Sequence, residues 1–193
     1  KEDVRSRIVM AARSEFIKYG YRKTSMRTIS AKSGVVLGNI YNYFKTKDDI
    51  LCAVLHPLLS AIGERMASHS KGEHEEKHLD FSSQRQKNFL KEMLRIIFLY
   101  KKELRLLLFE SQGTSLENFR ENFIDAQVAI SKTYMEQVGT RVSPLFFRIS
   151  ASTWVTIIGE IVMNPDLRKE EVRQALAEYI CYNTAGWQEL IKQ

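Results

Sequence analysis

The sequence predicts an all-α protein. Only three prolines and nine glycines interrupt its 193 residues, a composition that favours long helices over many short strands. Apolar residues recur at spacings of three and four along most of the chain, which is the period of an amphipathic helix. No segment of useful length alternates between apolar and polar residues as a half-buried strand would.

The first helix is predicted near the N-terminus. Its apolar face falls at intervals of four residues, on Val4, Ile8, Ala12 and Phe16. Gly20 follows and reads as the stop signal of this helix, since glycine is the usual residue just past a helix end.

Two short helices are predicted next, joined by a very tight turn. Thr24 and Ser25 offer an N-cap for a helix over residues 26–33, and Gly34 ends it. A third helix runs from about Leu37 to Phe44, so the two are separated by Gly34-Val35-Val36 alone. This arrangement predicts a helix-turn-helix domain, in which the second of the two helices can enter the major groove of DNA.

The rest of the chain is predicted to be a larger helical domain. Thr46 is expected to cap a fourth helix with acidic residues in its first turn, and Pro57 is expected to kink that helix. The polar residues 67–88 are predicted to be a linker. The domains are therefore expected at residues 1–46 and 47–193, and the later helices at about 89–100, 103–110, 116–138, 145–163 and 167–191, the last one capped by Asp166.

The net charge of +6 is confined to the first quarter of the chain. Residues 1–50 hold eleven Lys and Arg but five Asp and Glu, an excess equal to that of the whole chain. A basic head on a neutral body favours a polyanionic partner, double-stranded DNA. Cys52 and Cys181 form no pair motif, which indicates free thiols in a reducing cytoplasm.

Two sequence features suggest other interpretations, a zinc hydrolase and a membrane span. The run His74 to His78 matches H-E-x-x-H, a zinc hydrolase signature, but it lies in a polar stretch without the apolar face that such a helix packs. We interpret it as a solvated charged loop, and expect no catalytic residue, metal or cofactor. Residues 145–163 are long enough to span a membrane but contain Arg148 and Glu160, so a buried helix at a subunit interface fits better.

Residues 4–55 resemble the TetR family of transcriptional regulators. The likeness rests on order and spacing over some fifty residues, and above all on the string GNIYNYFKTKDDIL from Gly38 to Leu51. The resemblance implies a homodimer, an operator with two-fold symmetry and a C-terminal core that binds an unidentified small molecule. One departure is Val36, where the family usually has a Ser or Thr as N-cap of the recognition helix; valine cannot cap, and the helix start should be less stable by ~1 kcal/mol.

The candidate DNA-binding residues follow from the groove and backbone chemistry of DNA. Asn can pair with adenine and Arg with guanine, a leucine can meet a thymine methyl, and a glycine lets the backbone approach closely. The expected base contacts are Arg27, Thr28, Leu37, Gly38, Asn39 and Asn42. The expected phosphate contacts, chosen for a hydroxyl or amine at helix ends, are Thr24, Ser25, Tyr41, Tyr43 and Lys47, while Ile40 and Phe44 are expected to anchor the third helix in the core.

The C-terminal domain is expected to hold the effector and the dimer interface. The last two helices are expected to form a four-helix interface across a two-fold axis. The expected effector pocket is lined by Phe98, Phe109, Phe123, Tyr134, Phe147 and Trp154. The leading interpretation is a dimeric DNA-binding repressor released by a small molecule; the alternatives are a metal-dependent hydrolase and a helical ligand-binding module without operator binding.

Overall fold

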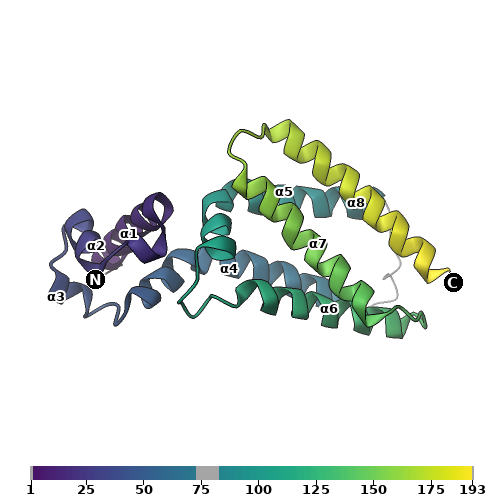
Figure 1. Ribbon diagram of the computed structural model, residues 1–193, viewed down its shortest axis with the longest axis horizontal. Helices are drawn as coiled ribbons and strands as arrows, with labels where there is room; N and C mark the ends of the chain where they lie inside the picture. The colour runs from purple at the N-terminus through teal and green to yellow at the C-terminus, as the bar shows by residue number, and fades with distance from the viewer. Residues whose placement is uncertain (1, 73–82, 193) are drawn as a thin grey trace. The chain divides into compact units, whose positions relative to one another are not determined.

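The computed structural model describes residues 2–72 and 83–192, and every regular element within these ranges is a helix. The all-α prediction is confirmed. The helices, shown in Figure 1, are α1 (Glu2–Lys23), α2 (Met26–Ser33), α3 (Leu37–Ile40), α4 (Lys47–Gly72), α5 (Ser83–Phe109), α6 (Phe119–Gln137), α7 (Pro144–Met163) and α8 (Lys169–Ile191).

The chain divides into two compact units. The first unit consists of Lys1–Ala61 and Lys102–Phe119, and the second of Ile62–Lys101 and Arg120–Gln193. This division differs from the expected boundary between residues 46 and 47, because the first unit includes the start of α4 and a later segment that contains the end of α5.

The first unit has one apolar core built on the predicted face of α1. Ile8, Ala12 and Phe16 are fully buried, as the four-residue spacing requires. The other helices of the unit contribute their own buried side chains. These are Ile29 of α2, Ile40 of α3, Phe44 after it, Ile50, Leu51, Leu55 and Leu58 of α4, and Leu104, Leu106 and Leu107 of α5.

Polar contacts attach the segment 102–119 to the head. Glu103, which is buried, forms an ion pair with Arg13 of α1. Arg105 donates from Nη2 to the Ile17 carbonyl at 3.1 Å, and the amide of Ser115 donates to the Asp48 carboxylate at 3.3 Å. These contacts join residues more than sixty positions apart, so local sequence patterns do not reveal them.

Most predicted helix ends in the first unit are confirmed. Ser25 is the N-cap of α2, and Gly34 ends that helix with a φ of 65°. The Asp49 amide donates to Thr46 Oγ1 at 3.0 Å, and the Thr46 amide donates to Asp49 Oδ2 at 2.8 Å. This reciprocal pair caps α4. Gly20 has a φ of 79° and interrupts α1, although a last helical turn follows it.

Other boundaries differ from the predictions. The helix expected over residues 37–44 ends at Ile40 and continues as turns, and the expected linker 67–88 is helical at 67–72 and again at 83–88. The break expected after Tyr100 is present within α5, at a φ of −121° and a ψ of 24°. Helix α8 starts after Arg168, whose amide donates to Glu171 Oε2 at 2.8 Å, and Asp166 does not cap it.

The second unit packs α7 against its neighbours through aromatic rings. Trp154 of α7 meets Phe89 of α5 edge-on at 5.4 Å and Tyr179 of α8 at 4.8 Å between ring centroids. Such edge-to-face pairs are favourable because of the ring quadrupole. On another side of α7, Arg148 pairs with Glu121 and Asp125 of α6, so the charge inside this apolar helix is neutralised by its neighbour.

Two helical stretches would be long and apolar enough to cross a membrane by length and composition alone. They are Lys47–Ala67 and Pro144–Met163, and 33% of each apolar window is buried within the single chain. Core helices of soluble proteins pass the same test, so it does not by itself indicate a membrane span. The more informative observation is the apolar surface that α7 leaves exposed.

Candidate nucleic-acid interface

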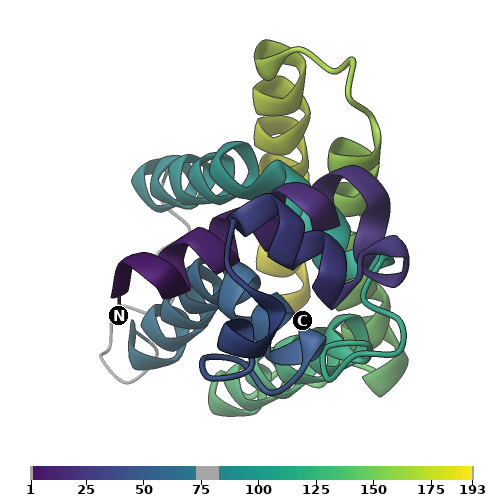
Figure 2. The same cartoon turned by 90° about the vertical axis from the view of Figure 1, so that its left-hand side faces the viewer.

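The turn between α2 and α3 is held by two polar contacts and one buried side chain. Arg7 of α1 donates from Nη2 to the Ser33 carbonyl at 2.8 Å, and Ser30 Oγ donates to the Val35 carbonyl at 2.7 Å. Val35 is buried, and Gly34 takes the left-handed conformation that this sharp turn needs. The contacts fix the angle at which α3 leaves α2. Figure 2 views α1, α2 and α3 from their outer side.

The segment from Val36 to Phe44 has one buried face and one exposed face. Ile40 is fully buried and Phe44 is 4% exposed, which confirms the predicted core pair. Val36, Asn39 and Asn42 are exposed and lie three residues apart. Val36 is the N-cap of α3, Asn39 lies on α3 and Asn42 lies in the turn after it; we call these three exposed residues the outer row.

The asparagine amides of the outer row are hydrogen-bonded to each other. Asn42 Nδ2 donates to Asn39 Oδ1 at 3.3 Å. This bond leaves the Asn39 NH₂ group as a donor and Asn42 Oδ1 as an acceptor. A row that presents both functions can address base edges in the major groove, where each base pair shows its own pattern of donors and acceptors.

Helix α3 begins without a side-chain cap, as the sequence predicts. The Val36 carbonyl accepts from the amides of Asn39 at 2.8 Å and Ile40 at 3.1 Å, but its side chain makes no capping bond. That side chain is 76% exposed. Leu37 beside it is half-buried.

Two of the candidates on and before α2 are committed to a capping box. Ser25 Oγ accepts from the Thr28 amide at 3.1 Å, while Thr28 Oγ1 accepts from the Ser25 amide at 2.9 Å. Thr28 Oγ1 also donates to the Ser25 carbonyl at 2.7 Å, which leaves its methyl group as the part free to meet DNA. Arg27 is exposed, and its guanidinium bonds to no other residue in the described part of the chain.

Two expected phosphate contacts, Thr24 and Lys47, are hydrogen-bonded to backbone carbonyls of the fold. Thr24 is 3% exposed, and its hydroxyl donates to the Gly20 carbonyl at 2.9 Å. Lys47 donates from Nζ to the carbonyls of Tyr21 and Thr24, both at 2.8 Å, and its ammonium lies 4.0 Å from the Tyr21 ring centre. The carbonyls that end α1 attract these donors because no intrahelical amide satisfies them.

The surroundings of Lys47 shift the pKa values of two side chains, Lys47 itself and Tyr21. Burial lowers the pKa of the Lys47 ammonium below its ordinary value of 10.5. Burial, with the carboxylate of Asp48 nearby, raises the pKa of Tyr21 above 10.0. Both shifts follow from removal of the charged form from water. They mark Lys47 and Tyr21 as part of the packed junction between α1 and α4.

The remaining candidates of the α3 region are accessible. Tyr41 is 42% exposed, and Tyr43 is half-buried. Gly38 is exposed, and a Cβ placed on it would meet nothing within 4 Å. The fold of this chain therefore does not demand a glycine at position 38, so its bare backbone is available to something outside the chain.

Arg7 and Ser30 were absent from the sequence-based candidates. Both orient α3 by binding carbonyls of the turn. An arginine near the start of an amphipathic helix gives no sequence signal for such a role, because its target lies 26 residues away.

The residues expected to line an effector pocket are dispersed. Phe147 is buried and stacks on Trp187, Trp154 contacts Phe89 and Tyr179, and Phe98 lies under the ammonium of Lys169 at 5.7 Å. Phe109 belongs to the first unit, whereas the other five lie in the second.

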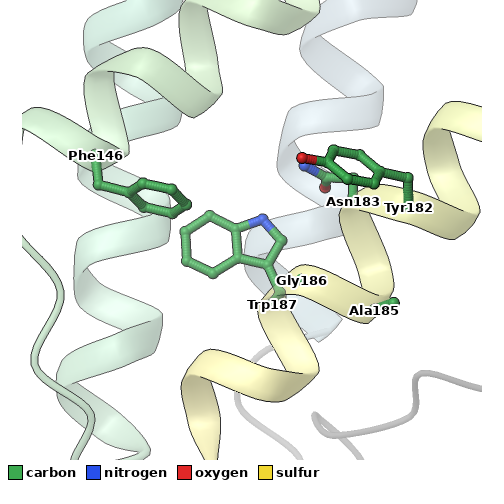
Figure 3. A pocket seen from close by; sticks show the side chains of 6 residues that line it. All are labelled: Phe146, Tyr182, Asn183, Ala185, Gly186 and Trp187. Atoms are coloured by element: carbon green, nitrogen blue, oxygen red, sulfur yellow. The ribbon is translucent and has the colours of Figure 1, made fainter.

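A hollow of about 280 Å³ lies on the second unit between α7 and α8. None of the six expected residues lines it. Figure 3 shows Phe146 of α7 pointing toward the indole of Trp187 on α8, with Tyr182 further along the same helix. Asn183, Ala185 and Gly186 complete its wall.

The described residues contain no group of three or more His, Cys, Asp and Glu side chains that could hold a metal ion. The H-E-x-x-H run at residues 74–78 lies outside the described residues.

The head is thus a helix-turn-helix unit of the kind that bacterial DNA-binding regulators use. Residues 8–54 match the sequence profile described as "Bacterial regulatory proteins, tetR family". Comparison with curated proteins gives no match.

Solved structures of transcriptional regulators share the fold over nearly the whole chain. A proposed TetR-family regulator from Syntrophomonas wolfei superposes with a TM-score of 0.67 at 20% identity, covering 95% of this chain and 96% of that one. A proposed fatty acid metabolism regulator from Clostridium perfringens gives 0.67 at 17% identity, covering 90% and 96%. NalD, the secondary repressor of the MexAB-OprM multidrug efflux pump in Pseudomonas aeruginosa, gives 0.63 at 18% identity, covering 95% of both chains. The likeness to the family profile is thus confined to the N-terminal residues 8–54, whereas the fold is shared with these solved structures over nearly the whole chain.

Proposed function

We propose that this chain is a cytoplasmic transcriptional repressor that binds a palindromic operator as a homodimer and leaves it when a small molecule binds the second unit. The observation that carries the proposal is the outer row of α3. Exposed donors and acceptors stand on a helix held by Arg7 and Ser30, in the part of the chain where all the net positive charge lies. The charge supplies affinity for phosphates, and the row supplies sequence selection.

The contacts on DNA are assigned accordingly. Asn39, Asn42, Arg27 and Leu37 face bases, with Gly38 allowing close approach of the backbone and Thr28 offering its methyl group. Ser25, Tyr41 and Tyr43 face phosphates. Thr24 and Lys47 act indirectly, by fixing the junction that positions these groups.

Uncovered apolar surface on α7 and α8 supports a homodimer. Leu145 and Ile149 of α7 are 67% and 54% exposed, and Tyr182 of α8 is 75% exposed. Apolar side chains gathered on adjacent helices mark an interaction surface, and a second copy is the partner that closes with two-fold symmetry. The hollow between Phe146 and Trp187 belongs to this face, where a side chain of the second copy can fill it. A symmetric dimer would place two α3 helices for half-sites about one DNA turn apart, about 34 Å.

The effector is assigned to the second unit, among the aromatic rings that pack α5, α7 and α8. Helix α4 begins in the first unit and ends in the second, so it connects effector and operator sites through the chain itself. Pro57 lacks the amide that would complete the helical bonding at its position. We place the pivot of the switch there; equal release of the wild type and Pro57→Ala from DNA by effector would contradict this.

The DNA-binding part is tested by selecting duplexes from a random pool and measuring the affinity of the selected DNA at several salt concentrations. We expect a palindrome in the selected pool and an affinity that falls steeply with salt, because neutralised phosphates release counterions. Failure to enrich any sequence would favour the alternative, a helical ligand-binding module without operator binding.

The dimer is tested by light scattering on Ile149→Asp. We expect the variant to be a monomer with impaired operator binding, since a buried unpaired carboxylate opposes association. Met10→Asp is the matched control, because Met10 is 69% exposed on α1 and should leave the dimer intact. Dimeric Ile149→Asp would contradict the assignment.

A further inference from the structure

Val36 presents the most exposed large apolar side chain in the described part of the molecule, at 76%. The same position carries no cap for α3, although Ser25 caps α2 a few residues earlier. A serine or threonine at position 36 would remove both disadvantages, since its hydroxyl could accept from the first amides of α3. For the stability of the fold alone, a polar residue at position 36 would therefore serve better than valine.

The position of Val36 connects it to the residues proposed to read bases. After Val36, the bonds Asn39 to Val36 and Asn42 to Asn39 both span three residues, at 2.8 and 3.2 Å between amide and carbonyl. These bonds make Val36, Asn39 and Asn42 consecutive members of one bonded segment that runs from the N-cap of α3 into the turn after it. All three side chains are exposed, and Val36 is the apolar one at the start of the outer row. Leu37, by contrast, is half-buried and turns partly toward the core.

The chemistry of the major groove offers one apolar group for such a side chain. Thymine displays its C5 methyl group there, and it is the only one of the four unmodified bases that carries a methyl group. We propose that Val36 is a specificity-determining residue that contacts the C5 methyl of one thymine in each operator half-site. The inference rests on the proposed function, since it needs an operator.

The spacing along the row locates the thymine. Three helical residues advance by about 4.5 Å, and successive bases lie about 3.4 Å apart along a strand. The thymine is therefore expected one or two base pairs from the pair that Asn39 contacts.

The test removes single methyl groups from the DNA. In the duplex selected by the intact chain, each thymine is replaced in turn by deoxyuridine in both half-sites, and affinity is measured for the wild type, Val36→Ala and Val36→Ser. The serine variant restores a capping group, so it separates loss of the methyl contact from loss of helix stability. Synthetic DNA without methylated cytosine leaves thymine as the sole source of the methyl group.

We expect one thymine whose replacement weakens wild-type binding by about fourfold per half-site, the effect of one buried methyl group. At that position both Val36 variants should bind thymine and uracil equally. Met10→Ala, another exposed apolar position in the head, should keep the wild-type ratio.

The inference is overturned if no thymine shows the effect. It is equally overturned if the effect persists unchanged in both Val36 variants. If the chain selects no DNA at all, the proposed function fails first and the inference fails with it, so the two failures are distinguishable.

Discussion

Replacement of Lys47 by methionine separates two roles that its ammonium could have. Methionine keeps an unbranched side chain that is one atom shorter, but it cannot donate to the Tyr21 and Thr24 carbonyls, which Lys47 Nζ reaches at 2.8 Å. If these bonds are its role, the substitution destabilises the first unit and leaves the phosphate contacts unchanged. If Lys47 instead binds a phosphate, the substitution leaves stability unchanged and removes that contact.

The magnitude follows from the contacts. Two hydrogen bonds from a charged donor contribute about 1.5–3 kcal/mol each, and the Tyr21 ring adds about 0.5–1 kcal/mol. Burial of the ammonium opposes this, as its lowered pKa indicates. We expect a net loss of about 2 kcal/mol, or a melting temperature lower by about 4–8 °C.

The assay combines thermal unfolding with the salt dependence of operator binding. Lys47→Met should melt early, while the slope of log affinity against log salt stays at the wild-type value. Lys45→Met is the matched control, because Lys45 is exposed two residues away and should melt like the wild type. The reasoning is refuted if Lys47→Met melts normally and its salt slope falls by about 0.9 per protomer, the value for one lost phosphate contact.

Three further predictions concern the glycines of the head, its ion pair and its pH response. Gly38→Ala should keep or slightly raise thermal stability, because nothing lies within 4 Å of the new Cβ, yet it should weaken operator binding. Gly34→Ala should destabilise the protein by about 1 kcal/mol or more, since φ is 65° and the new Cβ would lie 3.1 Å from Arg7 Nη2. Arg13→Met should destabilise by about 2 kcal/mol because it strands the buried Glu103, whereas Arg13→Met with Glu103→Leu should recover most of the loss in chemical denaturation. Because the pKa of Lys47 is lowered in the folded state, folding favours its neutral form; relative to Lys47→Met, the wild type should gain stability as the pH rises through that pKa toward 10.5 and gain nothing near neutrality.

Features that depend on a few neighbouring residues were predictable from the sequence. Ser25 and Gly34 bound α2 as expected, because capping and left-handed ends are local chemistry. The uncapped start of α3 at Val36 was equally visible, since valine has no acceptor. The burial of Ile40 and Phe44 followed from their spacing.

Features that depend on distant partners were not predictable. Lys47 donates to carbonyls 26 and 23 residues away, and no local sequence pattern indicates these bonds. The pairing of Arg13 with Glu103 joins residues 90 positions apart, and no sequence pattern around either residue indicates its partner. For the same reason the sequence does not indicate that residues 102–119 belong to the first unit.

The return of residues 102–119 to the first unit has a consequence for synthesis. Chains leave the ribosome from the N-terminus, and domains generally fold as units in that order. Here the first segment of the first unit emerges early but lacks the helical segment that carries Glu103, Leu106 and Leu107 until about forty intervening residues have followed. The head is therefore expected to finish folding late, which makes a truncated chain a poor competitor for the operator.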